Sequence, residues 1–251
     1  MFFGLDFNQI FLFPFKDAEA RKYFLIGCAV SLAAFIIPVI PILLLLGYTA
    51  RIAKQVFNNE TPHMIAWEDW GKMLEDGARM FGVRMVYLLP IFILVFPLIL
   101  AAIGMSLVIE NVNSADANSI IIVFSLITMG IMCLLTPISL SLAVITPAAE
   151  MHAVDKHEFA AGFRFREWWL IFRANLSGFI AAFVIYFVTS MILAFVLQII
   201  MATIILSCLL PILVPGITVY LTLIMYTTIA RAYKVGKEKL TQPQIVPVAA
   251  T

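Results

Sequence analysis

One uncharged run decides the fold of this chain. Residues 174–230 read ANLSGFIAAFVIYFVTSMILAFVLQIIMATIILSCLLPILVPGITVYLTLIMYTTIA. The run has 57 residues, whereas one helical crossing of a bilayer needs about 20. It therefore predicts two transmembrane helices, at residues 174–200 and 203–230, joined by a tight turn.

The composition of the whole chain also indicates a membrane protein. Hydrophobic residues make up 63% of the 251 residues and charged residues 12%, against about 45–50% and about 25% in soluble domains. Because water cannot solvate so much apolar surface, lipid must surround most of the chain. The sequence thus predicts an all-α, polytopic helical membrane protein. Its net charge of +1 provides no basic field, so no nucleic-acid partner is expected.

Three more uncharged runs lie at residues 23–50, 85–109 and 119–149. With the two helices above, they predict four full transmembrane helices plus an N-terminal segment, all in one transmembrane domain at residues 23–230. Pro38 and Pro41 lie near the middle of the first run, where they would break a helix. Residues 23–50 could therefore enter the membrane and return, which we favour, or cross it once as a fifth span.

Basic residues predict the orientation. Lys and Arg gather at residues 51–84, 150–173 and 231–251, and the polar turn at 110–118 has none. The positive-inside rule places the three basic regions, including the C-terminus, in the cytoplasm. The tail at 231–251 is basic and then contains proline, which is typical of a disordered segment.

Tryptophan and phenylalanine mark three candidate interfacial segments. Two cytoplasmic amphipathic helices are predicted, one around Trp67 and Trp70 and one around Trp168 and Trp169, because aromatic residues recur there among charged ones. Tryptophan prefers the interface, where its ring is in lipid and its N–H meets water. The arm at residues 1–22 is similarly rich in phenylalanine. The expected contacts with lipid or a partner are Phe3, Phe7, Phe11, Trp67, Trp70, Trp168 and Trp169.

A signature in the first third of the chain resembles a known family. Leu46-Gly47-Tyr48, Arg51, Asn59-Glu60-Thr61-Pro62, Trp67-Glu68-Asp69-Trp70-Gly71, Leu74 and Gly77 are similar to the pattern GY..R … P.W.DWG..L..G. This pattern is typical of an uncharacterised prokaryotic membrane family, domain of unknown function 4013. The residues that carry the signature are Gly47, Tyr48, Arg51, Pro62, Trp67, Asp69, Trp70, Gly71 and Gly77.

The resemblance covers most of the chain and is strong only over residues 14–82. Pro14-Phe15-Lys16-Asp17 and Gly27 also match the opening of the family, whereas four residues, His63-Met64-Ile65-Ala66, lengthen the usual link before Trp67. The resemblance implies a multi-pass protein of a prokaryotic inner or plasma membrane. It implies no activity, because the family has none assigned.

Residues that could carry chemistry are few. The densest group, Glu150-Met151-His152-Ala153-Val154-Asp155-Lys156-His157-Glu158, matches no zinc-enzyme spacing such as H-E-x-x-H, and we interpret it as a solvated cytoplasmic loop. Glu68 and Asp69 are adjacent and would point to different sides of a helix. The cysteines Cys28, Cys133 and Cys208 lie in apolar runs. We expect no disulfide, metal or cofactor.

The sequence therefore favours a non-catalytic membrane protein, a subunit or scaffold that binds lipids, other membrane proteins or itself. One alternative is a transporter or channel for a neutral or lipid-like solute, because six prolines lie within the uncharged runs beyond residue 84. A second is a membrane enzyme that acts on lipids through Glu68, Asp69, Glu150 or His152.

Overall fold

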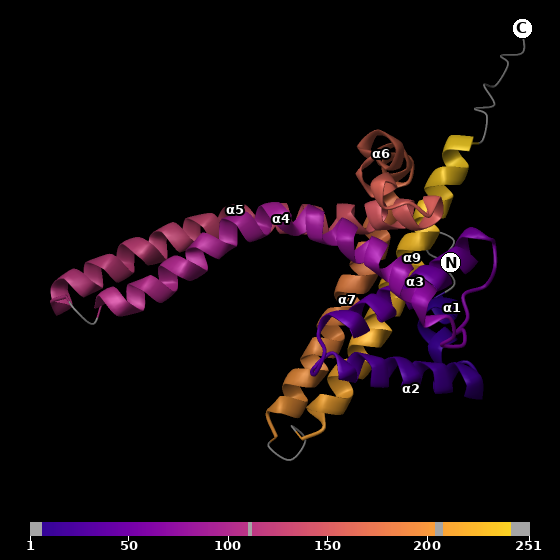
Figure 1. The fold of residues 1–251 in the computed structure, drawn as a ribbon, viewed down its shortest axis with the longest axis horizontal. Helices are drawn as coiled ribbons and strands as arrows, with labels where there is room; N and C mark the ends of the chain where they lie inside the picture. Colours follow the sequence, from indigo (N-terminus) through magenta and orange to yellow (C-terminus); the bar gives the residue numbers. More distant parts are fainter. Residues whose placement is uncertain (1–6, 110–111, 204–207, 242–251) are drawn as a thin grey trace, which may run out of the picture. The chain divides into compact units, whose positions relative to one another are not determined.

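The structure, a computed structural model, describes residues 7–109, 112–203 and 208–241, and these ranges are helical with short connections (Figure 1). The chain divides into two compact units. Unit 1 comprises Met1–Val83 and Pro147–Thr251, and unit 2 comprises Arg84–Thr146.

The N-terminal part of unit 1 contains α1 (Phe7–Leu12), the short 3-10 helix η1 (Phe13–Phe15), α2 (Ala18–Ala33) and α3 (Val39–Phe57). The Asp17 side chain caps α2 by accepting a hydrogen bond from the Ala20 N–H at 2.7 Å. The chain turns between α2 and α3, where Pro38 disfavours helix in the residue before it. Pro41 lies in the first turn of α3, where proline is tolerated. The break expected within residues 23–50 is thus present.

Two long helices pass from one unit to the other. These are α4 (Trp70–Ile109) and α5 (Ser114–Lys156). Residues 84–109 of α4 and 114–146 of α5 belong to unit 2. Almost every described side chain there is exposed or half-buried in the protein, and most are apolar. Lipid is the solvent that suits such a surface.

The C-terminal part of unit 1 is built around one helix. It contains η2 (Phe159–Phe163), α6 (Phe165–Ala174), α7 (Leu176–Met201) and α9 (Leu210–Thr241). α9 packs against α1, α2, α3, α6 and α7. The main hydrophobic cluster joins α9, through Val219 and Leu223, to Tyr48 of α3 and Trp67.

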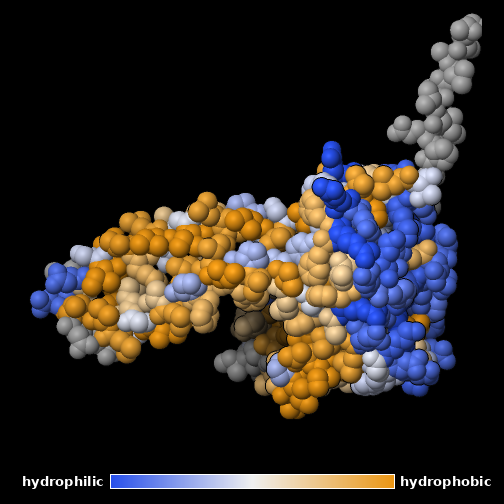
Figure 2. Space-filling model, turned by 45° about the horizontal axis from the view of Figure 1, so that its top comes forward, coloured by the Kyte–Doolittle hydropathy of each residue, from blue (hydrophilic) through white to orange (hydrophobic). Residues whose placement is uncertain are grey.

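Five helices are long and apolar enough to cross a membrane. They are Val39–Phe57, Trp70–Ile109, Asp116–Lys156, Leu176–Met201 and Leu210–Thr241. This confirms the prediction of an all-α polytopic membrane protein. Figure 2 shows hydrophilic residues gathered on one side of unit 1, beside a surface that is mostly hydrophobic.

Two expected elements differ from those in the structure. The segment around Trp67 is not a separate interfacial helix, because residues 60–69 are not helical and Trp70 begins α4. The expected disordered tail is instead helical as far as Thr241, where α9 ends. The Asn175 side chain donates to the Ala232 carbonyl at 2.9 Å, and Lys239 donates to Asn175 at 2.9 Å, so the residue between α6 and α7 stabilises this end of α9. Residues 242–251 lie outside the described ranges.

Candidate functional site

Two signature glycines let α3 and α4 cross with their backbones in contact. A methyl group on Gly47 would overlap the carbonyl oxygen of Met73, and one on Gly77 would overlap that of Leu43. The atoms in the way are backbone atoms, which cannot swing aside as a side chain can. Only glycine therefore fits at either position, and the spacing of the two glycines sets where the helices cross.

Signature residues also attach α2 to α3 through an aromatic stack. The rings of Tyr48 and Trp67 lie parallel, with centroids 4.2 Å apart. The Trp67 indole N–H donates to the Tyr23 carbonyl at 2.9 Å, and its ring lies against Gly27. The Tyr48 hydroxyl donates to the carbonyl of Ile65 at 2.9 Å and accepts from its N–H at 3.0 Å. Trp67 thus holds two helices and the segment after α3 together.

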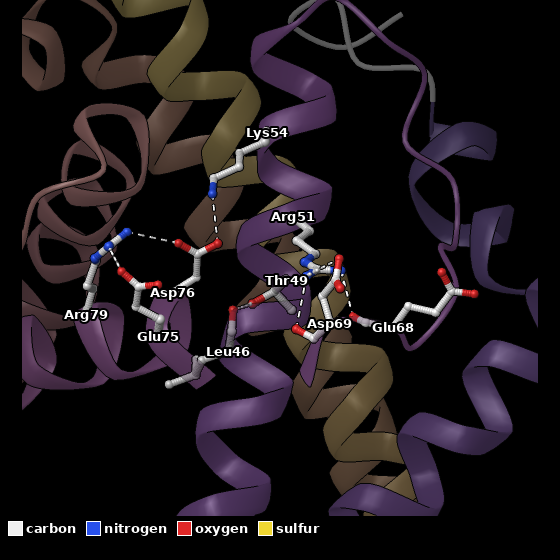
Figure 3. A network of polar contacts seen from close by, with 9 residues as sticks. All are labelled: Leu46, Thr49, Arg51, Lys54, Glu68, Asp69, Glu75, Asp76 and Arg79. Atoms are coloured by element: carbon white, nitrogen blue, oxygen red, sulfur yellow. Dashed lines mark hydrogen bonds and ion pairs between the residues drawn. The ribbon is translucent and has the colours of Figure 1, made fainter. Parts of the chain in front are cut away.

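A group of charged residues lies near these contacts between α3 and the start of α4 (Figure 3). Arg51 donates to the carbonyl oxygens of Glu68 and Asp69 at 2.9 and 3.2 Å, and its guanidinium lies 3.8 Å from the Asp69 carboxylate. These contacts hold the residues directly before α4. Asp69 itself adopts a positive φ of 53°, which Asp tolerates better than most residues.

One buried carboxylate lies at the centre of the same network. The Asp76 side chain is only 5% exposed, and its two oxygens accept from Lys54 at 2.8 Å and Arg79 at 3.1 Å (Figure 3). Arg79 also pairs with Glu75, whose side chain is 61% exposed. Because a buried carboxylate is costly without partners, the two cations explain how Asp76 is accommodated.

The remaining signature residues lie near the contacts between α3, the segment that follows it and the start of α4. The Trp70 indole N–H donates to the Trp67 carbonyl at 2.8 Å. Pro62 is half-buried in the segment after α3. A methyl group on Gly71 would meet no other atom within 4 Å, so no packing contact explains this glycine.

The expected interfacial aromatic residues fall into two groups. Trp70 is 47% exposed and Trp169 is half-buried, as a membrane or partner contact requires. Trp67 and Trp168, at 8% and 0% exposed, instead pack inside unit 1. In the arm, the half-buried Phe11 accepts a hydrogen bond at its carbonyl from Tyr220 at 3.3 Å. Phe3 and the Phe7 side chain lie outside the described part of the chain.

The group at residues 150–158 differs from the expected solvated loop. α5 continues to Lys156, and the side chains of Glu150 and His152 are buried at 0% and 1% exposed. They are covered because α9 packs over them: Tyr226 donates to the Glu150 carboxylate, and the Tyr233 hydroxyl lies 2.7 Å from Nδ1 of His152. The concentration of polar residues predicted a loop, but residues 150–154 are buried within α5, and only the exposed residues 157 and 158, beyond the helix, match that prediction.

His152 also connects the buried cluster to solvent. Its Nε2 lies 3.1 Å from the half-exposed Glu167 of α6. Tyr233 donates to Asp155 at 3.3 Å, and Asp155 pairs with Lys237 at 2.7 Å. Sequence reasoning missed the two tyrosines. Their spacing of seven residues, which places both on one face of α9, is the signal that could have found them.

Glu68 and Asp69, the other acidic residues proposed for catalysis, lie on the segment that Arg51 holds. Within the described ranges, no three His, Cys, Asp or Glu side chains come together in a way that could hold a metal ion. The signature residues and the buried cluster join helices of unit 1.

These features define a class: a polytopic helical membrane protein whose signature residues join its helices. The chain belongs to the family described as "Protein of unknown function (DUF4013)", which matches residues 30–206, more than half of its length. The resemblance read from Gly47, Tyr48 and the following residues is thus confirmed. No curated protein and no solved structure matches the chain.

Proposed function

We propose that this protein is a non-catalytic integral membrane component, a subunit or scaffold that binds lipids and other membrane-protein chains. One observation carries the proposal: the signature residues are engaged with each other. Close packing at Gly47 and Gly77 holds α3 against the start of α4. The stacked rings of Tyr48 and Trp67, with the indole hydrogen bond of Trp67, hold α2 and α3 together. A family whose signature maintains a helical framework fits a structural or binding role better than a reaction.

Unit 2 supports a role in the membrane itself. Of the residues in the most apolar windows of α4 and α5, 0% and 6% are buried inside the protein, so these parts of the two helices are open to their surroundings. Lipid tails or the helices of another subunit can cover such a surface equally well, because both are apolar. The family resemblance favours a prokaryotic inner or plasma membrane, and the charge bias favours a cytoplasmic C-terminal end.

Native mass spectrometry of the full chain, extracted in a mild detergent, tests the proposal. We expect a defined assembly, either several copies or a stoichiometric second membrane protein, with lipid retained. A bare monomer at every detergent concentration, with neither partner nor lipid, would contradict it. So would a lipid-converting activity that is lost when Glu68, Asp69, Glu150 and His152 are each replaced by alanine.

A second candidate is a transporter for a small solute, favoured by the burial of Glu150. An ionisable side chain that is 0% exposed, on a helix long enough to span the membrane, is expensive and often functional. The test is solute flux in sealed proteoliposomes, with Glu150→Gln as the variant. Transport that requires Glu150 would favour this candidate, and vesicles that stay sealed would remove it.

A further inference from the structure

A cleft in unit 1 combines features that neither the signature nor the buried cluster explains. It has a volume of about 350 Å³ and lies between α1, the end of α3 with the residues that follow, and the last four turns of α9. This is near the lower end of the range for small-molecule sites, about 300–1,000 Å³. A lipid headgroup is small enough for this cleft, and a whole lipid is not.

The cleft contains a buried hydroxyl without a partner. Thr227 lines it and is 3% exposed, and its Oγ1 makes no hydrogen bond to any described residue. Most buried hydroxyls in proteins are hydrogen-bonded, and an unmade bond costs about 1–3 kcal/mol. Because this oxygen is buried beneath the surface of the cleft, Thr227 makes the floor of the cleft polar without itself contacting a ligand.

Charges of both signs line the same cleft. Arg231 and Lys234 follow Thr227 on α9, one and two turns along, and both are half-buried. Glu60 and Glu238 provide two carboxylates, and Glu238 lies 4.0 Å from Lys234. A purely anionic ligand would meet repulsion from the two glutamates. A ligand that carries a phosphate and an amine complements both pairs.

The walls and the position of the cleft indicate that this ligand belongs to a lipid. Ile10, Val56 and Val235 add apolar surface beside the charges, which suits the glycerol and first methylene groups of a lipid. The cleft also lies where α9 changes from an uncharged to a charged sequence: residues 210–230 are uncharged, and Arg231 is the first charged residue of the helix. Headgroups of the surrounding bilayer occupy this level of a spanning helix.

We propose that the cleft binds the headgroup of a zwitterionic phospholipid with a primary amine, a phosphoethanolamine group. Its phosphate lies between Arg231 and Lys234, above the polar floor that Thr227 provides, and its ammonium faces Glu60 and Glu238. The proposal rests on the lipid-binding half of the proposed function, and it identifies the lipid class.

The experiment is a competition measured by native mass spectrometry on the delipidated full chain. Phosphatidylethanolamine, phosphatidylglycerol and phosphatidylcholine are supplied together, and inorganic phosphate is supplied in a separate arm. We expect one phosphatidylethanolamine per chain, retained about tenfold over the other lipids. Arg231→Gln should lower this binding about tenfold, whereas Arg166→Gln, which removes an exposed cation of α6, should leave it unchanged.

The acidic half of the cleft has its own variant. The double variant Glu60→Gln with Glu238→Gln should keep lipid bound and lose the preference for the ethanolamine headgroup. Equal binding of all lipids by the unaltered chain, no effect of Arg231→Gln, or displacement of lipid by inorganic phosphate would each overturn the proposal. The same spectra report the number of chains, so a monomer with a specific lipid and an assembly without one are distinguishable.

Discussion

At the scale of single residues, the family signature includes positions where only one side chain satisfies its surroundings. Gly47 and Gly77 leave no space for a methyl group, and Trp67 fills the space above Gly27 while its N–H is bonded to Tyr23. These requirements are steric and local, so their loss has predictable effects on stability.

We expect Gly47→Ala to lower the free energy of unfolding by about 3 kcal/mol, the upper end for overpacking, because the clash is with backbone. Gly71→Ala is the matched control. It lies in open space near the start of α4, so the helix propensity of alanine should leave stability unchanged or raise it by about 0.5–1 kcal/mol. Unfolding in mixed micelles, followed by circular dichroism, measures both. Equal stability of the two variants would show that α3 and α4 do not cross here.

The charged network predicts a second contrast. Asp76→Asn removes a carboxylate that is 5% exposed and paired with both Lys54 and Arg79, so it should cost about 2 kcal/mol. Glu75→Gln removes the neighbouring carboxylate, 61% exposed and paired only at the surface, and should cost less than about 1 kcal/mol. The same unfolding assay compares them, and a larger loss for Glu75→Gln would refute this ranking.

At the scale of elements, α9 organises unit 1 because it contacts helices from both ends of the chain. Its tyrosines reach buried groups of α5, and Gly236 allows a close approach of α6 at Ile171. These contacts explain why the helix continues past Arg231, where composition alone suggests disorder.

Tyr226→Phe tests this element directly. It leaves the Glu150 carboxylate, which is 0% exposed, without the tyrosine hydroxyl, and should cost about 1–3 kcal/mol. Tyr220→Phe, on the same helix, removes a longer bond of 3.3 Å from a half-buried hydroxyl and should cost less. Thermal unfolding in detergent provides the comparison. If the two variants melt at the same temperature, Glu150 does not depend on Tyr226.

At the scale of the whole molecule, contacts within unit 1 bear on the question of how residues 23–50 meet the membrane. The Tyr23–Trp67 bond places the first half of α2 beside the segment that follows α3. Gln9 of α1 likewise lines a cleft with Asn59 and with the charged end of α9. Both contacts support the re-entrant hairpin, since they bring the start of α2 to the side where α3 ends.

Cysteine labelling of intact cells tests this topology. In a chain whose three cysteines are replaced by alanine, Lys16→Cys and Thr241→Cys should react with an impermeant maleimide only after permeabilisation. Asn113→Cys, in the turn between α4 and α5, should react at once. If Lys16→Cys behaves like Asn113→Cys, residues 23–50 cross the membrane once.

The amino-acid sequence was enough to establish the class of protein and the places of the last four apolar helices, because partition into lipid depends on the summed apolar content of neighbouring residues. Which polar and aromatic residues are buried, and which partners they contact, was visible only in the tertiary structure. Trp67 meets Tyr23 across 44 positions, and Glu150 meets Tyr226 across 76. The burial of a tryptophan or a glutamate depends on the element that packs over it. That element is distant in the sequence, so the composition around the residue does not predict it.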